Sequence, residues 1–218
     1  MRKRLAFSMA FLAAAIIAPA AGAQPVSSWQ GSYVGLSAGG HFGTVGFNFP
    51  ATGESGTVHP SGFTGGVFGG HLWQSDRWIF GTELGFRAIS AAKSGTTPSG
   101  ITFRQNTNWV ADWRGIVGHS YGDWMAYVFG GLAYGSLTHR ATNAGGAWSN
   151  TETRTGWTAG LGAQKRITDK IALRLDYAYV DLGTAMCVIA PPPAPPLPPM
   201  PNVSHQSHDI TGGIVFNF

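Results

Sequence analysis

The chain has 218 residues, of which 32 are glycine, 12% are aromatic and only 11% carry charge. Soluble globular domains carry charge on about a quarter of their residues, so this composition is unusual for that class. The single cysteine, Cys187, excludes an internal disulfide bond.

The first residues have the pattern of a secretory signal peptide. Residues 2–4 are basic, residues 5–18 are almost continuously apolar, and Ala21-Gly22-Ala23 forms a cleavage site before Gln24. We therefore expect residues 1–23 to be removed on export and residues 24–218 to form one domain. Removal takes three of the 14 basic residues, which leaves eleven against ten acidic residues. This nearly neutral mature chain argues against a nucleic-acid partner.

From residue 32 onward, the chain contains segments in which apolar and polar residues alternate. The connections between these segments are long and short in turn. The alternation of apolar and polar residues predicts β-strands, and Asp, Gly and Ser mark the short connections as tight turns. The eight predicted strands are Ser32–Gly43, Gly62–Trp73, Trp78–Ala88, Asn108–Ser120, Trp124–Gly135, Arg154–Arg166, Ile171–Gly183 and His208–Phe218. The predicted turns are Gln74–Arg77, Tyr121–Asp123 and Ile167–Lys170, and the predicted long loops are Thr44–Ser61, Ile89–Thr107, Ser136–Thr153 and Thr184–Ser207.

This arrangement predicts an all-β fold, an eight-stranded antiparallel up-and-down transmembrane β-barrel. Beyond the signal peptide no apolar run approaches the roughly 18 residues of a membrane helix, whereas most predicted strands are close to the roughly 9–11 residues of a tilted membrane strand. Short turns on one side and longer loops on the other are typical of outer-membrane barrels, in which the turns face the periplasm and the loops face the exterior.

Charged residues indicate which face of each strand points into the barrel. In Ile171–Tyr179, Arg174 and Asp176 share one face, and an arginine facing lipid near the midplane would cost roughly 2–4 kcal/mol. We therefore expect a polar network inside the barrel, which an eight-stranded cylinder has just enough room to hold. Its predicted members are Glu83, Arg87, Arg114, Arg174 and Asp176. The alternative, a selectivity ring in an open channel, requires more strands than this chain supplies.

Large aromatic residues gather at the short turns and at the chain ends. In the predicted barrel these positions fall at one rim, where aromatic residues form a girdle at the membrane interface. The predicted members of the periplasmic girdle are Trp29, Trp73, Trp78, Trp124 and Phe218. The alternative is that they are core aromatic residues of a soluble β-sandwich.

Five segments in order resemble a known family. They are residues 29–36 (WQGSYVGL), 129–135 (FGGLAYG), 156–162 (GWTAGLG) and 173–183 (LRLDYAYVDLG), with the aromatic end at Phe218. Together they resemble the small outer-membrane β-barrels of alphaproteobacterial surface antigens, relatives of the membrane domain of outer membrane protein A. The resemblance implies a structural component or surface antigen of the outer membrane, in contact with lipid and lipopolysaccharide. It also implies recognition of the last strand by the barrel-assembly machinery, and it implies no catalytic residues, metal or cofactor.

Other functions rest on weaker signals. His205 and His208 have a spacing that could ligate a metal or haem iron, although we expect them to be solvated loop residues. His205 and Ser207 have the H-x-S spacing of the lipid A deacylases, but no acidic residue is evidently placed to orient the pair. A third alternative is an adhesin that binds its ligand through the long loops.

The last predicted loop, residues 184–207, is rich in proline. Residues 191–201 are expected to form a stiff polyproline II rod that projects outward, either as a spacer or as a partner-binding segment. Cys187 precedes this run, and we expect it to be a thiol without a structural role, with pairing to another molecule as the alternative.

Overall fold

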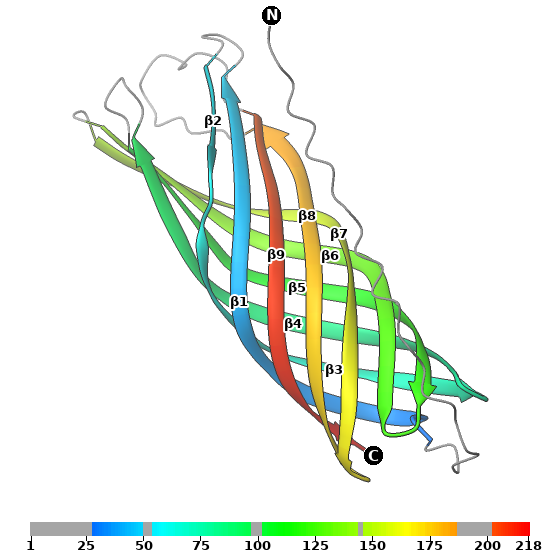
Figure 1. Cartoon of the computed structure of the whole chain (residues 1–218). Helices are drawn as coiled ribbons and strands as arrows, with labels where there is room; N and C mark the ends of the chain where they lie inside the picture. Colours follow the sequence, from blue (N-terminus) through cyan, green and yellow to red (C-terminus); the bar gives the residue numbers. More distant parts are fainter. Residues whose placement is uncertain (1–27, 50–53, 97–101, 144–145, 187–201) are drawn as a thin grey trace, which may run out of the picture.

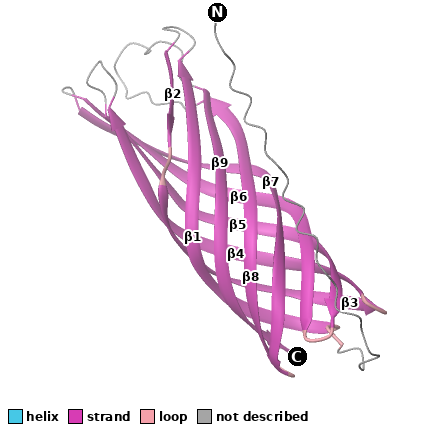
Figure 2. Ribbon diagram, viewed as in Figure 1, coloured by secondary structure: helices cyan, strands magenta, loops and turns pink. Residues whose placement is uncertain are grey.

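The structure, a computed structural model, describes residues 28–49, 54–96, 102–143, 146–186 and 202–218. These ranges form nine strands, shown in Figures 1 and 2. The strands are β1 (Gly31–Phe49), β2 (Glu54–Val58), β3 (Ser61–Ser75), β4 (Trp78–Thr96), β5 (Thr102–Tyr121), β6 (Trp124–Asn143), β7 (Gly146–Thr168), β8 (Ile171–Met186) and β9 (Asn202–Asn217). No helix in the described ranges has the length and hydropathy of a membrane span.

Eight of the strands close into a barrel. Each of β3 to β9 pairs with the next in antiparallel fashion, β1 pairs with β3, and β9 returns to pair with β1 from Tyr33↔Asn217 to Asn48↔Asn202. The result is one tall cylinder of tilted strands (Figure 1). The predicted eight-stranded antiparallel up-and-down barrel is confirmed. The ninth strand, β2, is an additional short strand that pairs only with β1.

Three two-residue turns join β3 to β4, β5 to β6 and β7 to β8, and they lie where the sequence predicts them. Such tight hairpins favour residues that tolerate a positive φ. Gly122 has a φ of 74° and Asp76 has a φ of 55°. These turns lie at one rim, which we call the turn end, and the opposite rim is the loop end.

Side chains alternate between the lumen and the outer surface along each strand. On β4, Trp78, Phe80, Leu84 and Phe86 are exposed, while Glu83, between them in the alternation, is 1% exposed. The same pattern recurs on β8, where Leu173 and Leu175 point outward. An outer surface of exposed large apolar residues is favourable only against lipid.

Aromatic residues border this apolar surface toward both rims. The turn-side belt contains Trp73, Trp78, Tyr121, Trp124 and Phe218. The loop-side belt takes one ring from each of the eight barrel strands: Phe42, Phe63, Phe86, Trp109, Tyr134, Trp157, Tyr179 and His208. Neighbouring rings of the loop-side belt touch, with centroids 5.7 Å apart for Phe86 and Trp109 and for Trp109 and Tyr134. From Trp124 to Tyr134, ten residues at about 3.3 Å each and a tilt of about 40° give a height of about 25 Å, which matches the apolar band of an outer-membrane barrel.

The strands continue well beyond the loop-side belt, so the predicted loops Thr44–Ser61, Ile89–Thr107 and Ser136–Thr153 are too long, whereas residues 187–201 of the fourth predicted loop lie outside the described ranges. β4 runs to Thr96 and β6 to Asn143, through segments predicted as loops. In this extension the alternation is inverted, because apolar residues such as Ile89, Leu137 and Val203 now face the interior and polar residues face water. Sequence reasoning took the polar residues as loop signals, although one face remained apolar.

Above the loop-side belt the closed wall divides into two sheets. The pairing of β3 with β4 stops at Gly62↔Ala91, next to Pro60, which has no N–H to donate. The pairing of β7 with β8 stops at Trp157↔Asp181, where β8 carries an irregularity at Gly183, whose φ is 71° and whose N–H donates to Asp181. The extension therefore consists of one sheet of β4 to β7 and another of β2, β1, β9 and β8.

Candidate functional site

The middle of the lumen contains a network of buried charged residues centred on Glu83 of β4. The carboxylate of Glu83 accepts hydrogen bonds from Arg114 Nε at 2.8 Å, from Arg174 Nη1 at 2.5 Å and from the hydroxyl of Tyr33 at 2.6 Å. It also pairs with Nη2 of Arg114. Because the carboxylate is satisfied on both oxygens by two arginines, its burial is compensated.

Two further carboxylates extend the network on either side. Asp176 accepts from Arg174 Nε at 2.8 Å and from the hydroxyl of Tyr127. Asp112 lies 3.5 Å from Arg114 Nε and accepts from Arg87 Nη2 at 3.1 Å. β4, β5 and β8 are thereby joined across the lumen by ion pairs.

Asp209 and His41 form the far end of the network. Asp209 accepts from Arg87 Nη1 at 3.0 Å, and its other oxygen lies 2.6 Å from Nδ1 of His41. His41 and Asp209 are both essentially inaccessible to solvent. The complete network, which we call the central network, comprises four carboxylates, three guanidinium groups and one histidine: Glu83, Asp112, Asp176, Asp209, Arg87, Arg114, Arg174 and His41.

Aromatic rings flank the guanidinium groups. The Arg114 guanidinium lies 4.2 Å from the centre of the Phe129 ring, and that of Arg174 lies 4.4 Å from the centre of Phe68. Such contacts are more favourable away from water. Gly162 leaves the room that Asp176 needs, since a Cβ atom there would overlap Asp176 Oδ1.

Apolar clusters lie above and below the central network. On the turn side the cluster includes Trp29, Leu72, Ile79, Met125 and Val215. On the loop side the cluster consists of Ile89, Ala91, Val110, Ala133, Leu137, Val180 and Leu182. The ion pairs therefore lie between two clusters of apolar side chains.

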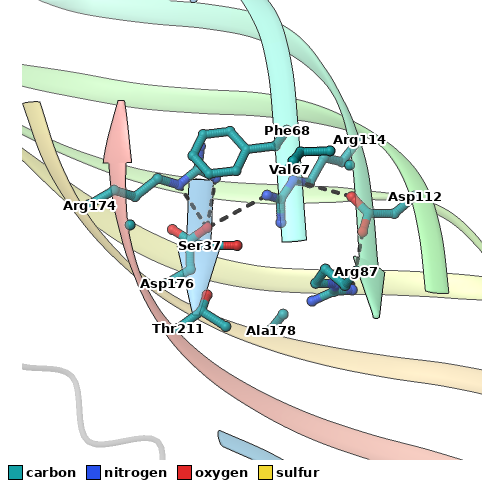
Figure 3. Close-up of a pocket in the computed structure, with 12 residues that line it drawn as sticks. Ser37, Val67, Phe68, Arg87, Asp112, Arg114, Arg174, Asp176, Ala178 and Thr211 are labelled. Atoms are coloured by element: carbon teal, nitrogen blue, oxygen red, sulfur yellow. Dashed lines mark hydrogen bonds and ion pairs between the residues drawn. The ribbon is translucent and has the colours of Figure 1, made fainter. Parts of the chain in front are cut away.

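A cavity of about 20 Å³ lies beside the central network (Figure 3). Arg87, Asp112, Arg114, Arg174 and Asp176 line it, and Figure 3 shows their charged groups turned toward one another around it. A water molecule requires about 10–15 Å³ of such volume, so this cavity has room for a single water.

The structure places all five residues predicted for the polar interior in the central network. Glu83, Arg87, Arg114, Arg174 and Asp176 are buried and connected by ion pairs. Sequence reasoning missed Asp112, Asp209 and His41. The sequence contains a signal for Asp112, because this residue precedes Arg114 by two positions and so shares its inward face. Their cross-lumen partners depend on the barrel register, which no local pattern contains.

The predicted aromatic girdle is partly corrected. Trp73, Trp78, Trp124 and Phe218 are exposed on the outer surface at the turn end. Trp29 is only 3% exposed and packs inside the barrel, where its Nε1 donates to the carbonyl of Gly122 at 3.2 Å and the Arg166 guanidinium lies 4.3 Å from its ring. Trp29 lies before Gly31, the first residue of β1, so the strand alternation does not direct its ring toward lipid. The ring packs inside the turn end of the barrel.

The histidine expectations are also corrected. His205 is not a solvated loop residue, because it lies in β9, is 1% exposed and places Nε2 3.4 Å from Thr107 Oγ1. Ser207 is also buried, so the two residues of the alternative deacylase reading face the interior. His208 points to the other side of the strand, 2.7 Å from the Tyr177 hydroxyl. His205 and His208 therefore do not converge, and within the described ranges no group of three or more His, Cys, Asp or Glu residues is placed to hold a metal ion.

Three sequence predictions lie outside the described residues. They are the signal peptide at residues 1–23, the polyproline segment at residues 191–201 and Cys187.

Comparison with known proteins identifies the family. Residues 10–218 match the model of the outer membrane protein beta-barrel domain. The chain is 34% identical over 185 residues to the 31 kDa outer-membrane immunogenic protein of Brucella melitensis, with 76% of each chain covered. It is 30% identical to the 25 kDa outer-membrane immunogenic protein of Brucella ovis, with 74% of each covered. The fold is similar to that of the outer membrane protein OprG from Pseudomonas aeruginosa, with a TM-score of 0.57, 14% identity and coverage of 88% of this chain and 100% of that one. The chain therefore belongs to the outer membrane protein beta-barrel domain family and spans the outer membrane of a Gram-negative bacterium.

Proposed function

We propose that this protein is a structural barrel and surface antigen of the outer membrane whose lumen is sealed. The central network carries the proposal, because it joins β1, β4, β5, β8 and β9 across the interior by ion pairs. The cavity beside it has room for one water, and apolar clusters lie on both sides. Such an interior provides rigidity instead of a path for solutes.

The proposed orientation places the turn end in the periplasm and the loop end outside the cell. Short turns and a tall opposite rim support it, since outer-membrane barrels have this asymmetry. The extension beyond the loop-side belt would then be the part of the molecule displayed to the surroundings. The relatives from Brucella melitensis and Brucella ovis are named as immunogenic proteins, which supports an antigenic role for this chain.

The proposal includes no catalytic role. The side chains of His205 and Ser207 are buried in the interior of the barrel. A lipid-modifying enzyme needs its nucleophile and base to face the outer leaflet. The proposed partners are outer-membrane lipid, lipopolysaccharide and, through β9, the barrel-assembly machinery. No cofactor is included.

Conductance measurements test the sealed lumen. Purified protein inserted into planar lipid bilayers should give no unitary current steps above those of protein-free membranes. Glu83→Ala, Arg114→Ala and Arg174→Ala combined, provided that the barrel still folds, should be the variant that admits ions. Stable unitary steps in the unmodified protein would contradict the proposal. Antibody against the extension should bind intact cells, and binding only after permeabilisation would contradict the orientation.

A further inference from the structure

The division of the wall leaves a long strand edge on β7. Residues 146–156 of β7 pair with β6 on one side, from Asn143↔Gly146 to Ala133↔Gly156. On the other side the ladder with β8 begins only at Trp157↔Asp181. This segment, which we call the β7 edge, is therefore eleven residues long and has no ladder partner among the described strands.

The other three edges at the two divisions are shorter within the described residues. β2 has five residues, β4 extends from Ala92 to Thr96 past its last pairing with β3, and the described part of β8 past its last pairing with β7 is Leu182–Met186. The first division also carries Pro60 and Lys93, residue types that hinder the addition of a further strand. The β7 edge contains neither proline nor lysine, and three of its residues are threonines, which favour strands. Among the described residues it is therefore the longest edge at these divisions, and its two charged residues, Glu152 and Arg154, pair with each other.

A line of polar side chains crosses the outer face of the same sheet toward the β7 edge. Asn108 Nδ2 donates to Thr138 Oγ1 at 2.9 Å, and the Thr138 hydroxyl lies 3.0 Å from that of Thr151. Thr151 is exposed and stands on the last strand of the sheet. A further strand beside β7 would place its own side chain next to Thr151 and continue this line.

We propose that the β7 edge binds an extended segment of a partner polypeptide, which adds to the sheet as an antiparallel strand. The ladder of main-chain donors and acceptors specifies a polypeptide in extended conformation, and Thr151 favours a Ser, Thr or Asn in the facing position. The edge lies above the loop-side belt, in the part of the barrel whose outer face is polar, so the partner is water-soluble. The location of that partner outside the cell rests on the proposed function, but the binding itself does not.

A second copy of this chain fits the edge poorly. Two copies in one membrane are related by an axis along the membrane normal, so both β7 strands would run toward the membrane and meet in parallel. Because the strands of a barrel are tilted by about 40°, the rotation would also cross them at a large angle. A ladder along eleven residues cannot form in that arrangement, which favours an independent segment.

Binding of a synthetic strand tests the proposal on the full-length mature protein in lipid nanodiscs. The probe is a capped peptide, Lys-(Thr-Val)₄-Lys, and the control is the same peptide with N-methyl groups on alternate residues, which removes the donors of one edge. Fluorescence anisotropy should show saturable binding of the probe and at least tenfold weaker binding of the control. Amide hydrogen exchange should slow within residues 146–156 when the probe is bound. Equal binding of both peptides, no binding at 1 mM probe, or protection confined to β2 and β4 would overturn the proposal.

Thr151→Ala provides the matched protein variant, because its hydroxyl is exposed and its loss leaves the barrel core unchanged. It should weaken binding of the threonine peptide about fivefold, the effect of one hydrogen bond. It should not change binding of a peptide with alanine facing Thr151, and Ser94→Ala on β4 should have no effect on either peptide. A concentration-dependent dimer that excludes the probe would show that a second copy occupies the edge and would also overturn the proposal. None of these outcomes depends on conductance, so they are separate from the test of the sealed lumen.

Discussion

Glu83 and Arg174 lie 91 positions apart in the chain, yet their side chains meet at 2.5 Å in the centre of the lumen. Arg114 contacts the same carboxylate from the neighbouring strand. One buried acid thus pairs with two buried bases, while Asp176 and Asp112 each add a contact to one of these arginines.

Removal of this acid should destabilise the barrel strongly. In Glu83→Ala, Arg114 and Arg174 lose their shared partner while still buried, and loss of one member of a buried ion pair costs about 3–5 kcal/mol. Urea unfolding of the refolded protein in lipid vesicles, followed by tryptophan fluorescence and heat-dependent gel mobility, measures the free energy of unfolding. Asp169→Ala in the exposed turn is the control and should stay within about 0.5 kcal/mol. An unchanged curve for Glu83→Ala would mean that the two arginines are satisfied without it.

Gly162 should not tolerate a larger side chain. A Cβ atom there would overlap Asp176 Oδ1 and the Tyr127 ring, so Gly162→Ala forces the network apart and should cost about 1–3 kcal/mol. Gly212→Ala is the matched control, since nothing lies within 4 Å of a Cβ at that position. Gly212→Ala should be neutral or slightly stabilising, because it restricts the unfolded chain. If both variants unfold at the same urea concentration, Gly162 is not needed for space.

Trp29 should report a different environment from the belt tryptophans. Variants that keep only Trp29 or only Trp78 allow each fluorescence to be quenched separately by brominated lipid and by aqueous acrylamide. Trp78, which is 55% exposed on the lipid side, should be quenched by the lipid, whereas Trp29 should resist both quenchers. Efficient quenching of Trp29 by brominated lipid would show that its ring faces lipid together with the other residues of the predicted girdle.

The boundary of the apolar band should be detectable by placing arginine at different heights. Val128 lies on the outer face between Trp124 and Tyr134, and Val128→Arg should destabilise the barrel by about 2–4 kcal/mol. Ser90 lies on the outer face of β4 beyond the loop-side belt, and Ser90→Arg should change the stability by less than about 1 kcal/mol. Equal effects at the two positions would place the membrane elsewhere on the cylinder.

Much of the transmembrane fold follows from local patterns. The alternation in Trp78–Ala88 and the charges in Ile171–Gly183 were sufficient to orient β4 and β8, because lipid tolerates no arginine at mid-depth. The pairing of Asp209 with Arg87 was not predictable, since it depends on the stagger of eight strands around the cylinder. The extension was missed because Ser90, Thr138 and Thr153 look like loop residues when apolar side chains are expected on the outside.

The inverted alternation also determines how deep the protein sits. Along β4 the last outward aromatic residue is Phe86, and three positions later Ile89 points inward. Sinking the barrel by one residue pair would bring Ala88 and then Ser90 against acyl chains, and raising it would transfer the ring of Phe86 into water. β1 and β6 carry the same crossover, because Val45 and Leu137 point inward beyond Phe42 and Tyr134. The molecule therefore has a single favourable level in the bilayer and holds its exposed sheets at a constant height above the surface.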